Sequence, residues 1–190
     1  YDTPLFSPKD LKKDFTDNDA KKVFGGLFRK DPAKAEKDAM TNFGVGLELT
    51  VKSHPSDFKP DASQALQKLR DLIGHRKDVP LAELKSAFCA APYGLTEAMV
   101  VLYACSLIKG GGYELALNPS SPITLIDQTP LAKNRLTTHA LALCEWNAKL
   151  DKALLGARLV VSVQNGWNEV LPYARVLDDT LKTAATPDEE

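Results

Sequence analysis

The sequence lacks any apolar run of about 18 residues, the length that a membrane-spanning helix needs. Its first residues, Tyr1 to Pro4, also lack the charged and apolar regions of a signal peptide. No excess of one charge is present either: 24 basic and 25 acidic residues leave a net charge of −1, so the chain as a whole has no strong field toward nucleic acid or anionic membrane. These absences predict a cytoplasmic protein without a membrane partner.

Cysteine is scarce. The three cysteines, Cys89, Cys105 and Cys144, are odd in number, widely spaced and set in apolar surroundings. A disulfide framework or a zinc site with paired ligands needs a different pattern. We therefore interpret all three as buried free thiols.

Complete catalytic and cofactor-binding motifs are missing as well. There is no Gly-x-x-x-x-Gly-Lys-Ser/Thr loop, no Gly-x-Ser-x-Gly elbow and no His-Glu-x-x-His helix. The glycines 110–112 follow a predicted helix and precede a predicted strand, which is the reverse of a phosphate loop, so they indicate a helix end.

The histidines His54, His75 and His139 are scattered, and a nucleophilic couple of Cys144 with His139 depends on geometry that the sequence does not give. We expect no catalytic residue, no metal and no cofactor in this chain, which makes it a module and not an enzyme.

What the chain has is apolar content, 44% of residues, ample for a buried core. Over residues 1–77, three helix starts are recognisable. Ser7-Pro8 and Asp31-Pro32 each place proline at a first helical position, and Thr16 with Asp19 resembles a capping arrangement. These signals predict three short helices.

Basic residues gather in this first part, where Lys9 to Lys37 holds nine basic and six acidic residues. The candidate nucleic-acid contacts are Lys12, Lys13, Lys21, Lys22, Arg29 and Lys30. Because these residues lie mostly between apolar positions of amphipathic helices, we favour a solvated helix face over a DNA-binding one.

Two further segments precede residue 78. In the stretch Gly44 to Val51, apolar and polar residues alternate only in part, which predicts either a short strand or an extended connection. From Ala62 to Ile73, apolar residues recur at spacings of three and four residues, which predicts a helix that ends at Gly74.

Residues 78–136 form a compact pattern of two helices. Pro80 opens a helix through Phe88, Ala91-Pro92-Tyr93-Gly94 makes a tight turn, and Thr96 caps a second helix, Glu97 to Lys109. A strand from Tyr113 to Leu117, a turn and a returning strand from Ile123 to Ile126 then predict a hairpin, after which Thr129-Pro130 starts a helix. The order helix, turn, helix, hairpin is typical of a winged-helix unit.

The second helix of this unit is apolar almost all round and offers few groups that read a base edge. The segment from Val79 to Arg135 is neutral, with four basic and four acidic residues. These two features favour a winged helix used for protein packing over one that enters a DNA groove.

Residues 137–190 have a largely helical pattern, although Leu159 to Val163 is β-branched enough for a strand. The predicted fold class is mainly α with a small β-hairpin: a winged-helix-like core at 78–136, flanked by helical segments at 1–77 and 137–190, packed as one or two compact domains.

Several motifs resemble an internal region of very large bacterial P-loop ATP-binding proteins, relatives of which belong to bacteriophage-exclusion (BREX) defence systems. The motifs are Phe24-Gly25-Gly26-Leu27-Phe28, Asn42-Phe43-Gly44-Val45-Gly46-Leu47, Ala90-Ala91-Pro92-Tyr93-Gly94-Leu95-Thr96 and Leu171-Pro172-Tyr173-Ala174-Arg175. The resemblance implies a parent protein that binds ATP through a Walker motif in an earlier domain and acts in phage defence. A chain that begins at Tyr1 and not at Met agrees with a piece of such a parent.

The first hypothesis is therefore a non-catalytic interaction module of a larger ATP-binding protein, whose partners are other domains of the parent or other proteins. The alternative is a winged-helix module that binds DNA without sequence preference. A third, an unrecognised enzyme, requires a pocket that gathers a histidine with carboxylates.

Overall fold

The computed structural model describes residues 15–51, 54–59 and 63–162, which form seven α-helices and six short strands, a mainly α fold with some antiparallel β. The helices are α1 (Asp17–Phe28), α2 (Lys34–Phe43), α3 (Gln64–Ile73), α4 (Leu81–Cys89), α5 (Glu97–Lys109), α6 (Thr138–Ala142) and α7 (Ala148–Leu154). The strands are β1 (Thr50–Val51), β2 (His54–Phe58), β3 (Asp78–Pro80), β4 (Tyr113–Ala116), β5 (Arg135–Leu136) and β6 (Arg158–Val161). No helix of these ranges is long and apolar enough to cross a bilayer.

The first helix begins as its capping residues predict. The Thr16 side chain accepts a hydrogen bond from the Asp19 backbone N–H at 3.2 Å, and the Asp19 carboxylate accepts one from the Thr16 N–H at 3.2 Å. Helix α2 has Ala33 at its N-cap, so Pro32 precedes the helix and does not open it. The helix predicted from Ser7-Pro8 lies outside the described residues.

The segment before α3 forms turns over residues 44–48, and only its end, β1, pairs as a strand with β2. The predicted α3 is confirmed: Ser63 caps its N-terminus, and Gly74, with φ 55°, follows its last residue. A left-handed residue at that position suits glycine, which has no Cβ to clash.

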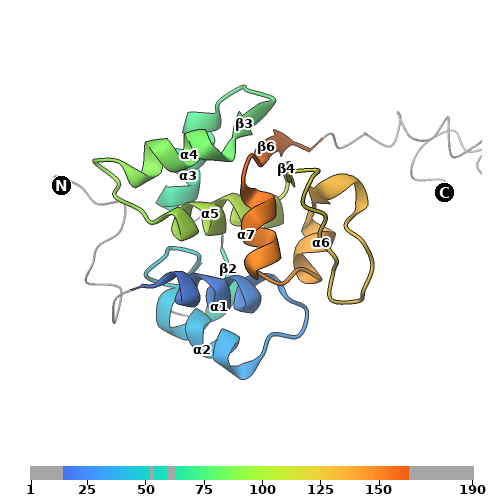
Figure 1. Cartoon of the computed structure of the whole chain (residues 1–190). Coiled ribbons are helices and arrows are strands. Elements are labelled where there is room, and N and C mark those ends of the chain that lie inside the picture. Colours follow the sequence, from blue (N-terminus) through green and yellow to red (C-terminus); the bar gives the residue numbers. More distant parts are fainter. Residues whose placement is uncertain (1–14, 52–53, 60–62, 163–190) are drawn as a thin grey trace, which may run out of the picture.

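Helix α5 runs through the middle of the molecule, with α3 and α4 on one side and α1 on the other (Figure 1). Every side chain from Ala98 to Ile108 is buried. Thr96 caps the helix and Gly110 ends it, as predicted. The expectation that a helix apolar all round is buried on most sides is confirmed, because α5 contacts α1, α3, α4, β4 and α6.

The larger sheet is antiparallel with strand order β3-β6-β4-β5. Val79, Leu159 and Leu115 lie side by side in the register and are fully buried, so this face packs on the core. Their neighbours along the strands, including Glu114 and Val160, occupy the outer face. The strand interpretation of residues 159–163 is confirmed as far as Val161.

The predicted hairpin is wrong. Strand β4 pairs with β6 on one side and with β5 on the other, and residues 123–126 pair with neither. That segment folds back instead on residues 129–131, through a Thr124–Pro130 bridge and a 2.8 Å hydrogen bond from Leu131 N–H to the Ile123 carbonyl. Strand β6 takes the place beside β4 instead and pairs with it over four residues, Arg158 to Val161.

The helix predicted from Thr129-Pro130 is also wrong: one short 3₁₀ turn, Ala132–Asn134, follows there. Residues 117–157 therefore stand between the neighbouring strands β4 and β6, and they carry β5, α6 and α7.

Candidate functional site

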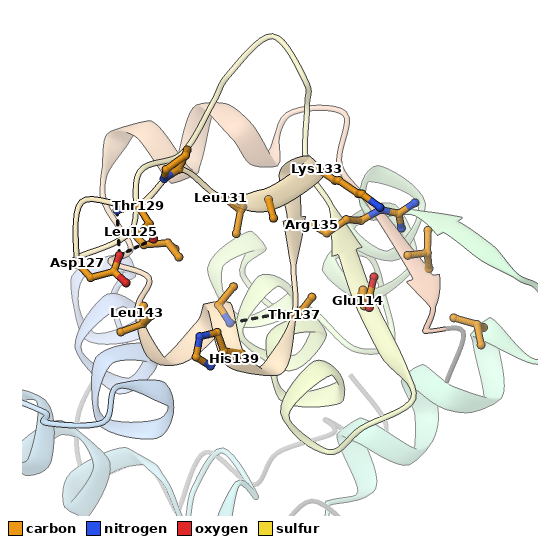
Figure 2. Close-up of a pocket in the computed structure, with 15 residues that line it drawn as sticks. Glu114, Leu125, Asp127, Thr129, Leu131, Lys133, Arg135, Thr137, His139 and Leu143 are labelled. Carbon is orange, nitrogen blue, oxygen red and sulfur yellow. Dashed lines mark hydrogen bonds between the residues drawn. The ribbon is translucent and has the colours of Figure 1, made fainter. Parts of the chain in front are cut away.

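A pocket of about 760 Å³ lies over the outer face of the sheet, beneath the arch that residues 125–133 form (Figure 2). Its residues come from β4, from the arch and β5, from the start of α6 and from β6. The fold thus brings together chain segments from Glu114 to Val161.

Apolar side chains make up most of the wall. They are Leu125, Pro130, Leu131, Ala132, Ala140, Leu143, Val160 and Val161. Leu125 and Leu131 are buried, whereas Val161 is 44% exposed at the rim. The cavity is therefore an apolar basin with a charged edge.

Two carboxylates lie at this edge, and each is held by neighbours. The Asp127 carboxylate accepts hydrogen bonds from the Thr129 hydroxyl at 2.6 Å and the Thr129 N–H at 3.0 Å. These bonds, with the nearby His139, hold the pKa of Asp127 below its usual value. The Glu114 carboxylate accepts a 3.3 Å bond from the Ser162 hydroxyl.

Two cations, Lys133 and Arg135, belong to the same edge. Figure 2 shows their side chains extending toward the same side. Neither forms a salt bridge with any described residue. By contrast, Arg158 on β6 pairs with Asp78 at 2.9 Å. Lys133 and Arg135 thus bring two like charges to one pocket, an arrangement that an anion would stabilise.

The arch has an unusual backbone. Gln128, Lys133 and Asn134 all have positive φ, at 68°, 50° and 50°. Each such non-glycine residue costs on the order of 1 kcal/mol, and such residues concentrate at binding sites. The strained backbone turns the arch over the sheet and holds Lys133 at the pocket edge.

Four of the six candidate nucleic-acid contacts are described, and they lie elsewhere, on and just after α1. Lys21 pairs with Asp151 at 2.7 Å, and Arg29 pairs with Glu36 at 2.7 Å and with Glu145 at 3.7 Å. Lys22 and Lys30 have no ion pair within the described ranges, and Lys12 and Lys13 lie outside them. None of the four described candidates, Lys21, Lys22, Arg29 and Lys30, lines the pocket.

The pairing of Cys144 with His139 does not occur. Cys144 is fully buried, and burial raises the pKa of its thiol to about 12, so it is protonated at neutral pH. His139 is exposed at the pocket, and no hydrogen bond joins the two among the described residues. Within these residues no three potential metal ligands gather.

In the sequence, Lys133, Arg135, Glu114 and Asp127 contribute only to the balance of four basic and four acidic residues from Val79 to Arg135. One local signal was present: an Asp two residues before a Thr is typical of an Asx turn, which predicts an ordered loop. The arch and strand β6 are distant in the sequence and meet only in the folded chain. No local pattern in the sequence therefore predicts the pocket between them.

Compared with models of known protein families, with curated proteins and with solved structures, the chain matches none of them.

Proposed function

We infer that this chain is a non-catalytic interaction module built on a winged-helix-like unit that serves protein packing. The observation that carries the proposal is the burial of α5 from Ala98 to Ile108. In a DNA-binding unit of this type the second helix of the turn enters the major groove and must expose polar donors. Here that helix is the centre of the core.

The connectivity supports the winged-helix part of the proposal. Helices α4 and α5 are joined by the turn at residues 91–94, where Gly94 has φ 62°. The strand after the second helix, β4, enters an antiparallel sheet in which β6 lies between β3 and β4. Apart from the edge strand β5, the strand order is β3-β6-β4, and in this proposal the residues 117–157, which connect β4 to β6, take the position of the wing.

The alternative, DNA binding without sequence preference, has less support. It needs several free cations on one surface, on the order of six to ten phosphate contacts in well-studied cases. Two of the four described candidates, Lys21 and Arg29, already pair with carboxylates.

The wider setting is a proposal that rests on the motif resemblance alone: a larger ATP-binding parent protein with a role in phage defence, whose other domains, or other proteins, are the partners of this chain.

The structure gives a physical reason for the glycines of one motif, Phe24-Gly25-Gly26-Leu27-Phe28. At Gly26 an added Cβ would stand 2.4 Å from Met40 Cγ and 2.6 Å from the Glu36 carbonyl oxygen, so the glycine permits α1 and α2 to cross closely.

The test combines two titrations with cross-linking. A labelled DNA duplex titrated with the chain at about 50 and 200 mM salt should show no salt-dependent shift at micromolar protein, and ATP should give no heat in calorimetry. Lysine cross-linking in native cell extract should join Lys149 or Lys152, exposed on α7, to peptides from outside these 190 residues.

A salt-dependent DNA shift would support the DNA-binding alternative, and tight ATP binding by the chain itself would overturn the non-catalytic proposal. Cross-links confined to the 190 residues would contradict the interaction role.

A further inference from the structure

The pocket over the sheet has the size and lining of a small-molecule site. Its volume, about 760 Å³, lies within the usual range of roughly 300–1,000 Å³ for ligand pockets. Such pockets are mostly apolar with a few convergent polar groups. Here Leu125, Leu131, Leu143 and Val160 supply apolar surface, and the polar groups stand at the edge.

The two cations indicate the charge of the ligand. Lys133 and Arg135 both line the pocket, and neither forms an ion pair with a carboxylate among the described residues. An ammonium and a planar guanidinium at the edge of one pocket can bind a carboxylate or sulfonate group through charge-assisted hydrogen bonds.

The backbone gives independent support for the role of Lys133. Its φ of 50° is one that glycine adopts without strain and that lysine does not. A lysine at this position therefore carries a conformational cost for a side chain that forms no ion pair in the described structure. Binding of a ligand would explain why lysine, and not glycine, occupies this position.

The carboxylates of the pocket limit the ligand to a low charge. Lys133 and Arg135 are balanced by Glu114 and Asp127, so the lining has no net charge when His139 is counted as neutral. A polyphosphate would meet two carboxylates as well as two cations. A single negative group with an apolar body fits the distribution better.

We propose that this pocket binds a small organic monoanion, with its carboxylate- or sulfonate-type head group at Lys133 and Arg135 and its apolar body against Leu131, Leu143 and Val160. The site is independent of the packing role of α5, and either proposal stands without the other.

Two dyes of nearly the same shape test the charge preference. The probe is 8-anilinonaphthalene-1-sulfonate, an apolar monoanion that fluoresces in apolar sites, and its neutral counterpart is N-phenyl-1-naphthylamine. We expect the folded chain to bind the anionic dye with one site per chain and about tenfold more tightly than the neutral dye. Equal affinity for the two dyes would overturn the assignment of an anion site.

A matched pair of double variants locates the binding. Lys133→Gln with Arg135→Gln should weaken the anionic dye about tenfold and change the neutral dye by less than about twofold. Lys149→Gln with Lys152→Gln removes the same charge from the exposed face of α7 and should change neither. Equal weakening in both pairs would mean that the dye responds to overall charge, which would contradict the proposal.

A third variant tests the cavity. Ala132 is exposed at the pocket wall, so Ala132→Trp fills the pocket without disturbing the core. It should weaken both dyes about tenfold, while near-ultraviolet circular dichroism and the thermal midpoint stay those of the parent chain. Undiminished dye binding in this folded variant would place the dye elsewhere and overturn the proposal.

Discussion

The hydroxyl of Tyr103 donates a 2.8 Å hydrogen bond to the backbone carbonyl oxygen of Leu47, which lies 56 residues earlier in the chain. Both residues are fully buried. The bond ties the turn after α2 to the central helix α5. Because that turn carries no helix or strand of its own, this bond is one of the contacts that fix its position.

Removing this hydroxyl tests its contribution. Tyr103→Phe keeps the ring but leaves the Leu47 carbonyl without this donor in a dry core, so we expect the free energy of unfolding to fall by about 1–3 kcal/mol in urea denaturation. Tyr113→Phe is the control, since Tyr113 is partly exposed and its hydroxyl forms no hydrogen bond with the described residues. Equal losses in the two variants would contradict the role of the Leu47 bond.

The close crossing of α1 and α2 gives a second prediction. Gly26→Ala should lower the free energy of unfolding by about 1–3 kcal/mol, because the new methyl group would meet the Glu36 backbone oxygen, which the helix holds in place. Gly110→Ala is the matched change: its Cβ would stand 3.4 Å from the nearest atom, the Ser106 carbonyl oxygen. Gly110→Ala should change the free energy of unfolding by no more than about 1 kcal/mol, in the stabilising direction. Thermal or urea unfolding of both variants measures the difference.

Local signals predicted where α1 and α5 begin and where α3 and α5 end. The capping residues Thr16 and Thr96 and the helix ends Gly74 and Gly110 are where the sequence indicated, because a cap depends on groups within one turn of the chain. The burial of α5 also followed from sequence, since a helix that is apolar on every side has no face for water.

Strand pairing did not follow from sequence. A hairpin with Ile123 to Ile126 was the nearest pairing for β4, but β6, beyond α6 and α7, takes that place. The choice between two partners depends on packing between distant segments, which local patterns do not contain. The pocket depends on the same pairing, so its residues stayed unconnected until the fold was known.

Arg29 provides a third prediction, which also separates structure from DNA binding. Its side chain is 21% exposed and forms an ion pair with Glu36, whose side chain is 14% exposed. Arg29→Gln should lower the free energy of unfolding by about 1–2 kcal/mol, because it leaves the half-buried Glu36 carboxylate without its cation. Lys30→Gln, an exposed neighbour without an ion pair in the described ranges, should change stability by less than about 0.5 kcal/mol. If both variants are as stable as the parent chain and both weaken DNA binding, the result supports the DNA-binding alternative and contradicts a structural role for the Arg29–Glu36 pair.

The buried thiol of Cys144 makes stability depend on alkaline pH. Burial raises its pKa from 9.0 to about 12 in the folded chain, whereas in the unfolded chain the thiol ionises near its ordinary value. Between these two values the folded state keeps a proton that the unfolded state has lost. The stabilising contribution is therefore complete below about pH 9 and is lost as the pH rises toward 12, with a slope of about 1.4 kcal/mol per pH unit.

Urea unfolding of the parent chain and of Cys144→Ala at several pH values from 8 to about 10.5 measures this slope. The variant has no thiol to ionise at this position, so its deficit relative to the parent should shrink as the pH rises above about 9. Val23→Ala is the control, because it trims a fully buried side chain that does not titrate, and its deficit should be the same at every pH. A constant deficit for Cys144→Ala would mean that the thiol ionises equally in both states, and that Cys144 is open to water in the folded chain.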